Sequence, residues 1–166
     1  LIFCYRGWVD LVYEDQGEPF RLYAGNCVIQ PPEIRHRVLF ASDNIEVIEI
    51  GVPAEHVTTI DHDMELPNGP ANPDRVFQGQ RFVHHKADAA TWQPEWAAHD
   101  SDILFTFVME GTMELQGEGR DPYTLEAGDA FVVPPGMKVR YAAPSDDLEL
   151  LEVSLPGVFN TRTGEN

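Results

Sequence analysis

The chain has 166 residues, of which 28 are acidic and 11 are basic, and its formal net charge is −17 at pH 7. This charge repels nucleic acid and anionic membrane surfaces, so we expect neither as a partner. No run approaches the roughly 20 apolar residues that a membrane-spanning helix needs, and the first residues form no basic-then-apolar leader. We therefore expect a cytoplasmic protein.

Thirteen glycines and thirteen prolines are spread along the chain. They interrupt every long periodic window, which predicts short strands joined by turns and no helix. Cys4 and Cys27 have no C-x-x-C spacing and lie in apolar runs, so we expect buried free thiols.

The first strands follow one another closely. An apolar strand over 1–5 leads through a turn at Gly7 to an alternating strand over 8–13. A polar turn over 14–18, a short strand and a Gly-x5-Pro-Pro turn beginning at Gly25 come next, before a final pair of strands. The same series begins again with the apolar strand 103–109 and the strand 112–115.

The chain contains an internal repeat. Residues 42–53 read SDNIEVIEIGVP and residues 145–156 read SDDLELLEVSLP, and both alternate acidic with aliphatic residues. Gly25 and Gly128 match in the same register, and one residue of slippage brings Gly7 opposite Gly111. We therefore predict one folding unit built twice, with barrels over 1–55 and 81–157, a linker over 56–80 and a tail over 158–166.

The repeated turn resembles a motif of the cupin family. The segments Gly25–His36 and Gly128–Val139 are similar to the cupin motif Gly-x5-Pro-x-Gly-x2-His, although Glu33 and Val139 depart from it. This resemblance implies an all-β protein made of two tandem cupin barrels, each a double-stranded β-helix or jelly roll.

The resemblance also implies a metal ligand in the first barrel, at His36. Its partners would belong to the other cupin motif, which would precede Leu1, so we expect the first barrel to be truncated at its N-terminus and segments near Trp96 to be missing. Imidazole and carboxylate ligands suit one divalent Fe, Mn, Ni, Zn or Cu ion and do not distinguish among them.

The second barrel keeps one histidine of the family's ligand set. The corresponding positions are Ala97, His99, Leu104 and Val139, and one neutral imidazole does not hold a metal. We expect this barrel to be metal-free, with His99 as a hydrogen-bonded interior or rim residue and only a vestigial candidate ligand.

The remaining histidines are less informative. His84 and His85 are adjacent on an expected strand, so only one of them faces inward. His56 and His62 lie in the polar linker, and we interpret them as part of a solvated loop.

Three functions remain open. The leading hypothesis is a small-molecule enzyme with one divalent metal in the first barrel, which by resemblance would carry out oxygenation, isomerisation or decarboxylation. The alternatives are a non-catalytic protein that binds a small ligand and a structural or storage assembly. A homodimer is expected under all three, and no catalytic residue is identified.

Overall fold

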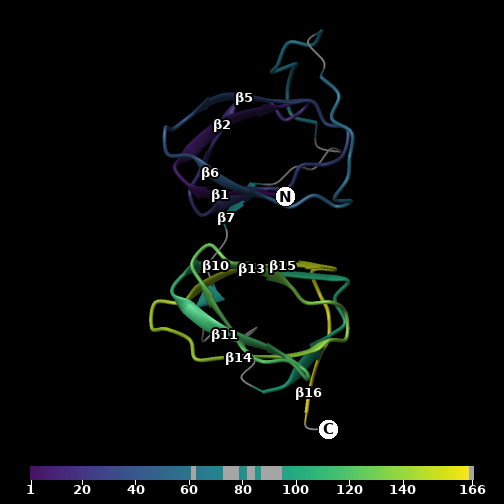
Figure 1. Ribbon diagram of the computed structural model, residues 1–166. Helices are drawn as coiled ribbons and strands as arrows, with labels where there is room; N and C mark the ends of the chain where they lie inside the picture. The colour runs from purple at the N-terminus through teal and green to yellow at the C-terminus, as the bar shows by residue number, and fades with distance from the viewer. Residues whose placement is uncertain (61–62, 73–78, 82–84, 87–94, 165–166) are drawn as a thin grey trace. The chain divides into compact units, whose positions relative to one another are not determined.

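The computed structural model of the protein describes residues 1–60, 63–72, 79–81, 85–86 and 95–164 (Figure 1). These residues form strands and turns without a helix, which confirms the all-β prediction. Accordingly, none of the described residues belongs to a helix long and apolar enough to cross a membrane.

The chain divides into two compact units, Leu1–Val83 and His84–Asn166. The first unit has two antiparallel sheets, in the strand orders β6-β1-β4-β7 and β3-β2-β5. Its strands are β1 (Ile2–Arg6), β2 (Trp8–Tyr13), β3 (Phe20–Tyr23), β4 (Asn26–Val28), β5 (His36–Ala41), β6 (Glu46–Glu49) and β7 (Gly79–Arg81).

The second unit also has two antiparallel sheets, in the orders β13-β10-β15-β8 and β12-β11-β14-β9-β16. Its strands are β8 (His85–Lys86), β9 (Ala97–His99), β10 (Ile103–Glu110), β11 (Thr112–Gly117), β12 (Tyr123–Glu126), β13 (Ala130–Val132), β14 (Lys138–Ala142), β15 (Glu149–Leu155) and β16 (Thr161–Thr163).

The two units share the pairing of their central strands, and the β1–β6 and β10–β15 pairs have the same register. Cys4 pairs with Val47 in the first unit and Val108 pairs with Leu150 in the second, and a bulge follows each pair. The turn after each bulge is closed in the same way, because the Oγ of Ser42 or Ser145 accepts a hydrogen bond from the backbone amide of Trp8 or Thr112. The repeat seen in the sequence is therefore a repeat of backbone structure.

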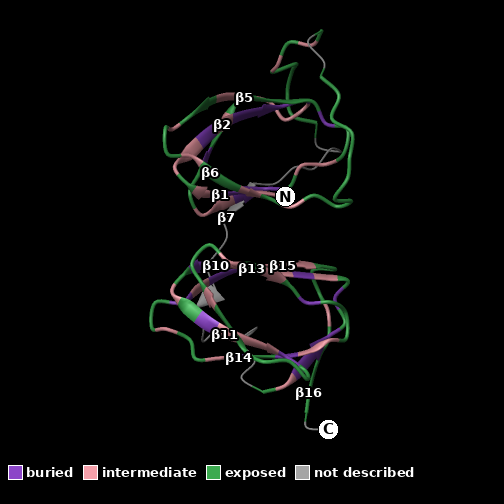
Figure 2. Cartoon of the chain, in the orientation of Figure 1, coloured by how far each residue is buried: buried purple, intermediate pink, exposed green. Residues whose placement is uncertain are grey.

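Each unit buries its own apolar cluster between its two sheets (Figure 2). Alternation along the strands places every second side chain on this inner face. The buried cluster of the first unit consists of Cys4, Val9, Leu11, Tyr13, Leu22, Val28 and Ile34. That of the second unit consists of Leu104, Val108, Met113, Val133, Val139, Tyr141, Leu148 and Leu150.

Two short strands lie outside the barrel bounds expected from the sequence. β7 begins within the expected linker and pairs with β4, and β16 lies in the expected tail and pairs with β9. Part of the linker also packs on the first unit, because Asn68 Oδ1 accepts a hydrogen bond from the Asp15 amide at 2.9 Å. These segments are polar and short, so hydrophobic periodicity does not reveal them.

The described edges of the sheets differ between the units, since β7 pairs with β4 in the first and β8 pairs with β15 in the second. Among the described residues, β5 pairs with β2 alone, whereas its counterpart β14 pairs with both β11 and β9. In the register of the repeat, the counterpart of β9 falls before Leu1.

Candidate functional site

The inner face of the first unit is exposed on both of its sheets. Val38 pairs with the buried Leu11, and Val47 pairs with the buried Cys4, so both valines share the face of the apolar cluster. Their exposed fractions are nevertheless 59% and 43%.

The corresponding face of the second unit is closed. Register places Tyr141 at the position of Val38 and Leu150 at the position of Val47. Tyr141 is 2% exposed and Leu150 is 3% exposed. Among the described residues, the inner face of the first unit is therefore more exposed at these two positions than that of the second unit.

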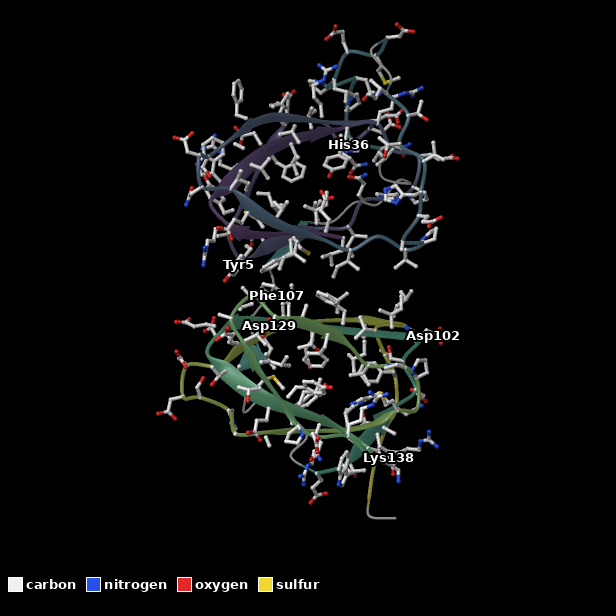
Figure 3. The ribbon with its side chains drawn as sticks, in the orientation of Figure 1. Tyr5, His36, Asp102, Phe107, Asp129 and Lys138 are labelled. Atoms are coloured by element: carbon white, nitrogen blue, oxygen red, sulfur yellow. The ribbon has the colours of Figure 1, made fainter. Side chains whose placement is uncertain are left out.

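His36, predicted from the sequence as a metal ligand, lies at this open face (Figure 3). It is the register partner of Tyr13, so the two side chains project from the same side of the β2–β5 pair. Their rings stack with centroids 5.5 Å apart and planes inclined by 20°. The Nδ1 of His36 lies 3.2 Å from the Ile34 carbonyl oxygen, and the residue as a whole is exposed.

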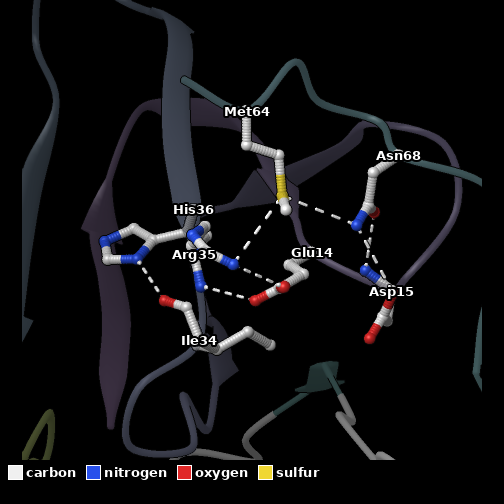
Figure 4. A network of polar contacts seen from close by, with 7 residues as sticks. All are labelled: Glu14, Asp15, Ile34, Arg35, His36, Met64 and Asn68. Atoms are coloured by element: carbon white, nitrogen blue, oxygen red, sulfur yellow. Dashed lines mark hydrogen bonds and ion pairs between the residues drawn. The ribbon is translucent and has the colours of Figure 1, made fainter. Parts of the chain in front are cut away.

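Arg35 anchors the start of β5 on the other side of the strand (Figure 4). Its guanidinium donates to the Glu14 carboxylate at 3.0 Å, and its backbone amide donates to the same carboxylate at 3.2 Å. Since neighbouring residues of a strand point in opposite directions, this network holds the backbone at Arg35 and leaves the His36 ring on the inner face.

Tyr13 and Glu49 bring polar atoms to the same face. The Tyr13 hydroxyl donates to Gln30 Oε1 at 3.2 Å, although the residue is only 1% exposed. Glu49 pairs with Ile2, which packs against the buried cluster, so its carboxylate also faces inward. Burial, and then the charge of Glu49, raise the pKa of the Tyr13 hydroxyl, which keeps it a proton donor at neutral pH.

The residues at this face do not by themselves fit a metal ion. A protein metal site takes three or more nitrogen, oxygen or sulfur ligands at close range. No group of three His, Cys, Asp or Glu side chains capable of this occurs among the described residues. His36 supplies one nitrogen and Glu49 one carboxylate, so we derive no metal-dependent step.

His99 lies in the second unit as a buried imidazole. Ala97 pairs with the core residue Val139, so His99, two residues later on β9, faces the same interior. Its Nδ1 lies 3.0 Å from Thr161 Oγ1, and its ring meets the edge of Phe159 with centroids 5.7 Å apart. Burial lowers the pKa of His99, with the nearby Asp100 opposing the shift, so the ring is neutral at pH 7.

A second polar group lies inside the second unit. Thr106 is fully buried and pairs with Glu152 across β10 and β15. Burial, and then the charge of Glu152, raise the pKa of Tyr141, while Thr106 opposes the shift. Thr106 and Tyr141 are enclosed in the packed core, so they are less accessible than His36 and Glu49 of the first unit.

The other predicted histidines do not join either group. His56 is exposed in the segment after β6. His62 and His84 lie outside the described residues, and for His85 the structure describes only the backbone, as part of β8.

Sequence reasoning overlooked Glu49 and Tyr13. Glu46 and Glu49 are three residues apart on one strand, so alternation requires that they face opposite sides. With Glu46 paired to Arg6 at the surface at 3.0 Å, Glu49 must face inward. Tyr13 carried no such signal, because an aromatic residue at the end of an alternating strand is usually core.

Comparison with known proteins agrees with this architecture. Residues 85–154 match the family model described as Cupin domain. No curated protein matches the chain by sequence. Among solved structures, one from a study of the Mn(II) centres of Bacillus subtilis oxalate decarboxylase superposes with a TM-score of 0.63 at 11% identity.

Two mutants of the same B. subtilis enzyme superpose with TM-scores of 0.62 and 0.59, at 12% and 13% identity. Each of the three matches covers 98% of this chain and 64% of the oxalate decarboxylase chain. The chain therefore spans less than two thirds of the length of these enzymes, and at such low identity the likeness shows the fold alone. The protein thus has the fold of the cupin superfamily, with a sequence match to a cupin domain over residues 85–154.

Proposed function

We propose that the chain is a bicupin that binds a small organic molecule on the open inner face of its first unit, while the second unit is a packed structural partner. One observation carries the proposal: the inward-facing Val38 and Val47 are 59% and 43% exposed, whereas their counterparts Tyr141 and Leu150 are buried. An accessible apolar face with a few convergent polar groups is the usual composition of a ligand site.

The exposed polar groups that would orient the ligand are His36 and Glu49, while the Tyr13 hydroxyl is buried and donates to Gln30. The Tyr13 hydroxyl and the His36 ring lie on one sheet, and the Glu49 carboxylate lies on the other. Their placement allows a bound molecule to contact apolar side chains and hydrogen-bonding atoms together.

Methyl NMR of the whole chain during titration with a library of small organic compounds tests this proposal. We expect at least one compound to shift the methyl signals of Val38 and Val47 saturably, without comparable shifts at the matched methyls of Leu150. Shifts confined to Leu150 and its neighbours, or no saturable shift at all, would contradict it.

A metal-dependent reaction is a second candidate. It is favoured by the inward position of His36 and by the Mn(II) centres named for a similar structure, and it requires donors beyond those in the described residues. It predicts near-stoichiometric metal in the purified protein and loss of that metal in His36→Ala, with His99→Ala as the matched control. Metal-free protein with a fully folded first unit would rule this candidate out.

The homodimer and the small-molecule ligand expected from the sequence remain proposals of the same kind. Light scattering coupled to size-exclusion chromatography tests the dimer directly, and an apparent mass near 18.7 kDa, the mass of one chain, would contradict it.

A further inference from the structure

The outer face of one sheet in the second unit carries three cationic side chains. Lys138 and Arg140 are two residues apart on β14, and the residues that alternate with them belong to the buried core, so both point outward. Lys138 on β14 and Arg162 on β16 are both register partners of Ala98 on β9, which places the two on one face. Figure 3 shows Lys138 on the outer side of this unit. We call Lys138, Arg140 and Arg162 the cationic face.

The charged ends of this face are accessible and are not separated by a bulky side chain. Neighbouring strands lie about 4.8 Å apart, so the backbones at Lys138 and Arg162 are about 10 Å apart across β9. Ala98 between them is 7% exposed, whereas Arg140 and Arg162 are exposed. Lys138 lies 3.4 Å from the exposed Glu118 carboxylate, and a solvent-exposed pair of this kind is weak. The longer cationic side chains can therefore reach beyond the alanine to a common ligand.

Arg140 is held in place by neutral groups. Its Nε donates to Gln116 Oε1 at 2.8 Å, and the Gln116 Nε2 in turn donates to the Arg120 carbonyl oxygen at 2.8 Å. The guanidinium carbon also lies 5.1 Å from the centroid of the Trp96 ring. These contacts orient the guanidinium through its Nε and one of its faces, so its terminal Nη groups are oriented in advance of any ligand.

Among the described residues, no carboxylate forms an ion pair with Arg140 or Arg162. Asp100 follows β9, but both of its carboxylate oxygens accept hydrogen bonds from Asn160, at 2.6 and 2.8 Å. Carboxylates outnumber basic residues in this chain by 28 to 11, so arginines without one are unexpected. Ion pairs do hold three arginines of the first unit, namely Arg6 with Glu46, Arg21 with Asp10 and Arg35 with Glu14.

A phosphate group matches this arrangement. It carries a charge of about −1.5 to −2 at pH 7 and three strong acceptor oxygens, and the planar guanidinium of arginine binds such a group through two parallel hydrogen bonds. At physiological salt the Debye length is about 8 Å, so acidic groups elsewhere on the chain are largely screened. We infer that the cationic face binds the phosphate group of a small molecule through Arg140, Arg162 and Lys138. This inference concerns the second unit and is independent of the function proposed for the first.

Three anions test this inference: phenyl phosphate, inorganic phosphate and benzoate. Each is titrated into the whole chain at about 150 mM salt, and binding is read by NMR from the Arg140 Nε–H and the Trp96 indole N–H signals. We expect saturable shifts with the phosphate compounds and at least about tenfold weaker binding of benzoate, which has fewer acceptor oxygens and less charge. The relative affinity of the two phosphate compounds shows whether the face takes inorganic phosphate or a phosphorylated organic molecule.

Three variants that each remove one positive charge locate the effect. Arg140→Gln and Arg162→Gln should each weaken phosphate binding about tenfold or more, because each removes a charged hydrogen-bond donor. Arg6→Gln removes the same charge from an exposed ion pair of the first unit, and it should leave the affinity unchanged. Unchanged amide signals of β10 and β15 confirm that the second unit of each variant is folded.

Several outcomes would overturn the inference. Benzoate that binds as tightly as both phosphate compounds would show that the face does not select phosphate. Equal weakening by Arg6→Gln and Arg140→Gln would show an effect of net charge alone. The absence of a saturable shift with either phosphate compound would show that the cationic face is a solvated surface, whatever the first unit binds.

Discussion

Gly117 of the second unit occupies the position that Tyr13 occupies in the first. Tyr13 is the register partner of His36, and Gly117 is the register partner of Val139, at the same point of the repeated strand pair. A Cβ atom at Gly117 would lie 2.8 Å from Met137 Cε. The methionine side chain thus approaches the place where the first unit carries an aromatic ring, and this exchange helps to close the second interior.

Substitution of Gly117 tests this packing. Gly117→Ala should destabilise the second unit by less than about 1 kcal/mol, because the new methyl group meets the end of a flexible methionine side chain that can move aside. In the Met137→Ala background that contact is absent, so the two substitutions should show a coupling energy of about 0.5 kcal/mol. Denaturant unfolding of the two single variants and the double variant measures this coupling energy. Simple additivity of the two effects would contradict a contact between position 117 and Met137.

Val47 and Leu150 form a matched pair for measuring how open each interior is. Leu150→Ala should destabilise the second unit by about 2–5 kcal/mol, since it leaves a cavity in a close-packed cluster. Val47→Ala should cost less than about 1 kcal/mol, because its side chain is already partly in water. Hydrogen exchange of the β15 and β6 amides reports the two units separately, and equal losses would show that the first interior is as packed as the second.

The repeat could be predicted from the sequence because its signals are local. Alternation of acidic and aliphatic residues predicted the β6 and β15 segments. The paired glycines Gly7 and Gly111 predicted the turns before β2 and β11. Both features depend on neighbouring residues and on backbone conformation, which periodicity and turn chemistry describe directly.

The character of the candidate site depends instead on contacts between distant residues. Glu49 was visible as one of a repeated pair of glutamates, but its inward position depends on its pairing with Ile2 on β1. The exposure of Val38 likewise follows from which strands pair beside β5, and no feature of the HRVLFA segment encodes that. His36 was predicted as a site residue because it matches a position of the family motif. Its stacking partner Tyr13 matches no position of that motif and was not predicted.

Of two comparable glycines in the second unit, Gly111 should tolerate substitution by alanine less well than Gly119. Its φ is +78°, and an added Cβ would lie 2.8 Å from Leu148 Cα and also contact Ser145 Oγ. Gly119 has a similar φ of +71° with nothing within 4 Å of an added Cβ. Gly119→Ala therefore measures the cost of the backbone conformation alone, about 1–2 kcal/mol.

Gly111→Ala should cost about 3 kcal/mol or more, because the backbone conformation and the collision with Leu148 and Ser145 act together. Thermal unfolding of the two variants side by side measures the difference. Equal melting temperatures would mean that the turn before β11 relaxes to accommodate a methyl group.

His99 should make the second unit sensitive to mild acid. Burial holds the pKa of this imidazole below its ordinary value of 6.5, while Asp100 opposes the shift. In the unfolded chain the ring takes up a proton near pH 6.5, whereas the folded unit resists protonation until a lower pH. The unfolded state therefore binds more protons in this window, and stability falls as the pH decreases through about 6.5 toward the folded pKa.

The contribution of His99 to the pH dependence of stability can be separated from that of the many carboxylates. One proton taken up on unfolding gives a slope of at most about 1.4 kcal/mol per pH unit. His99→Gln should remove that part of the slope below about pH 6.5, and His56→Gln, which removes an exposed histidine of the first unit, is the control. Denaturant unfolding of the second unit across this range provides the measurement. A slope that His99→Gln leaves intact would mean that the imidazole is protonated in the folded unit, and that Thr161 and Asp100 stabilise its charge within the barrel.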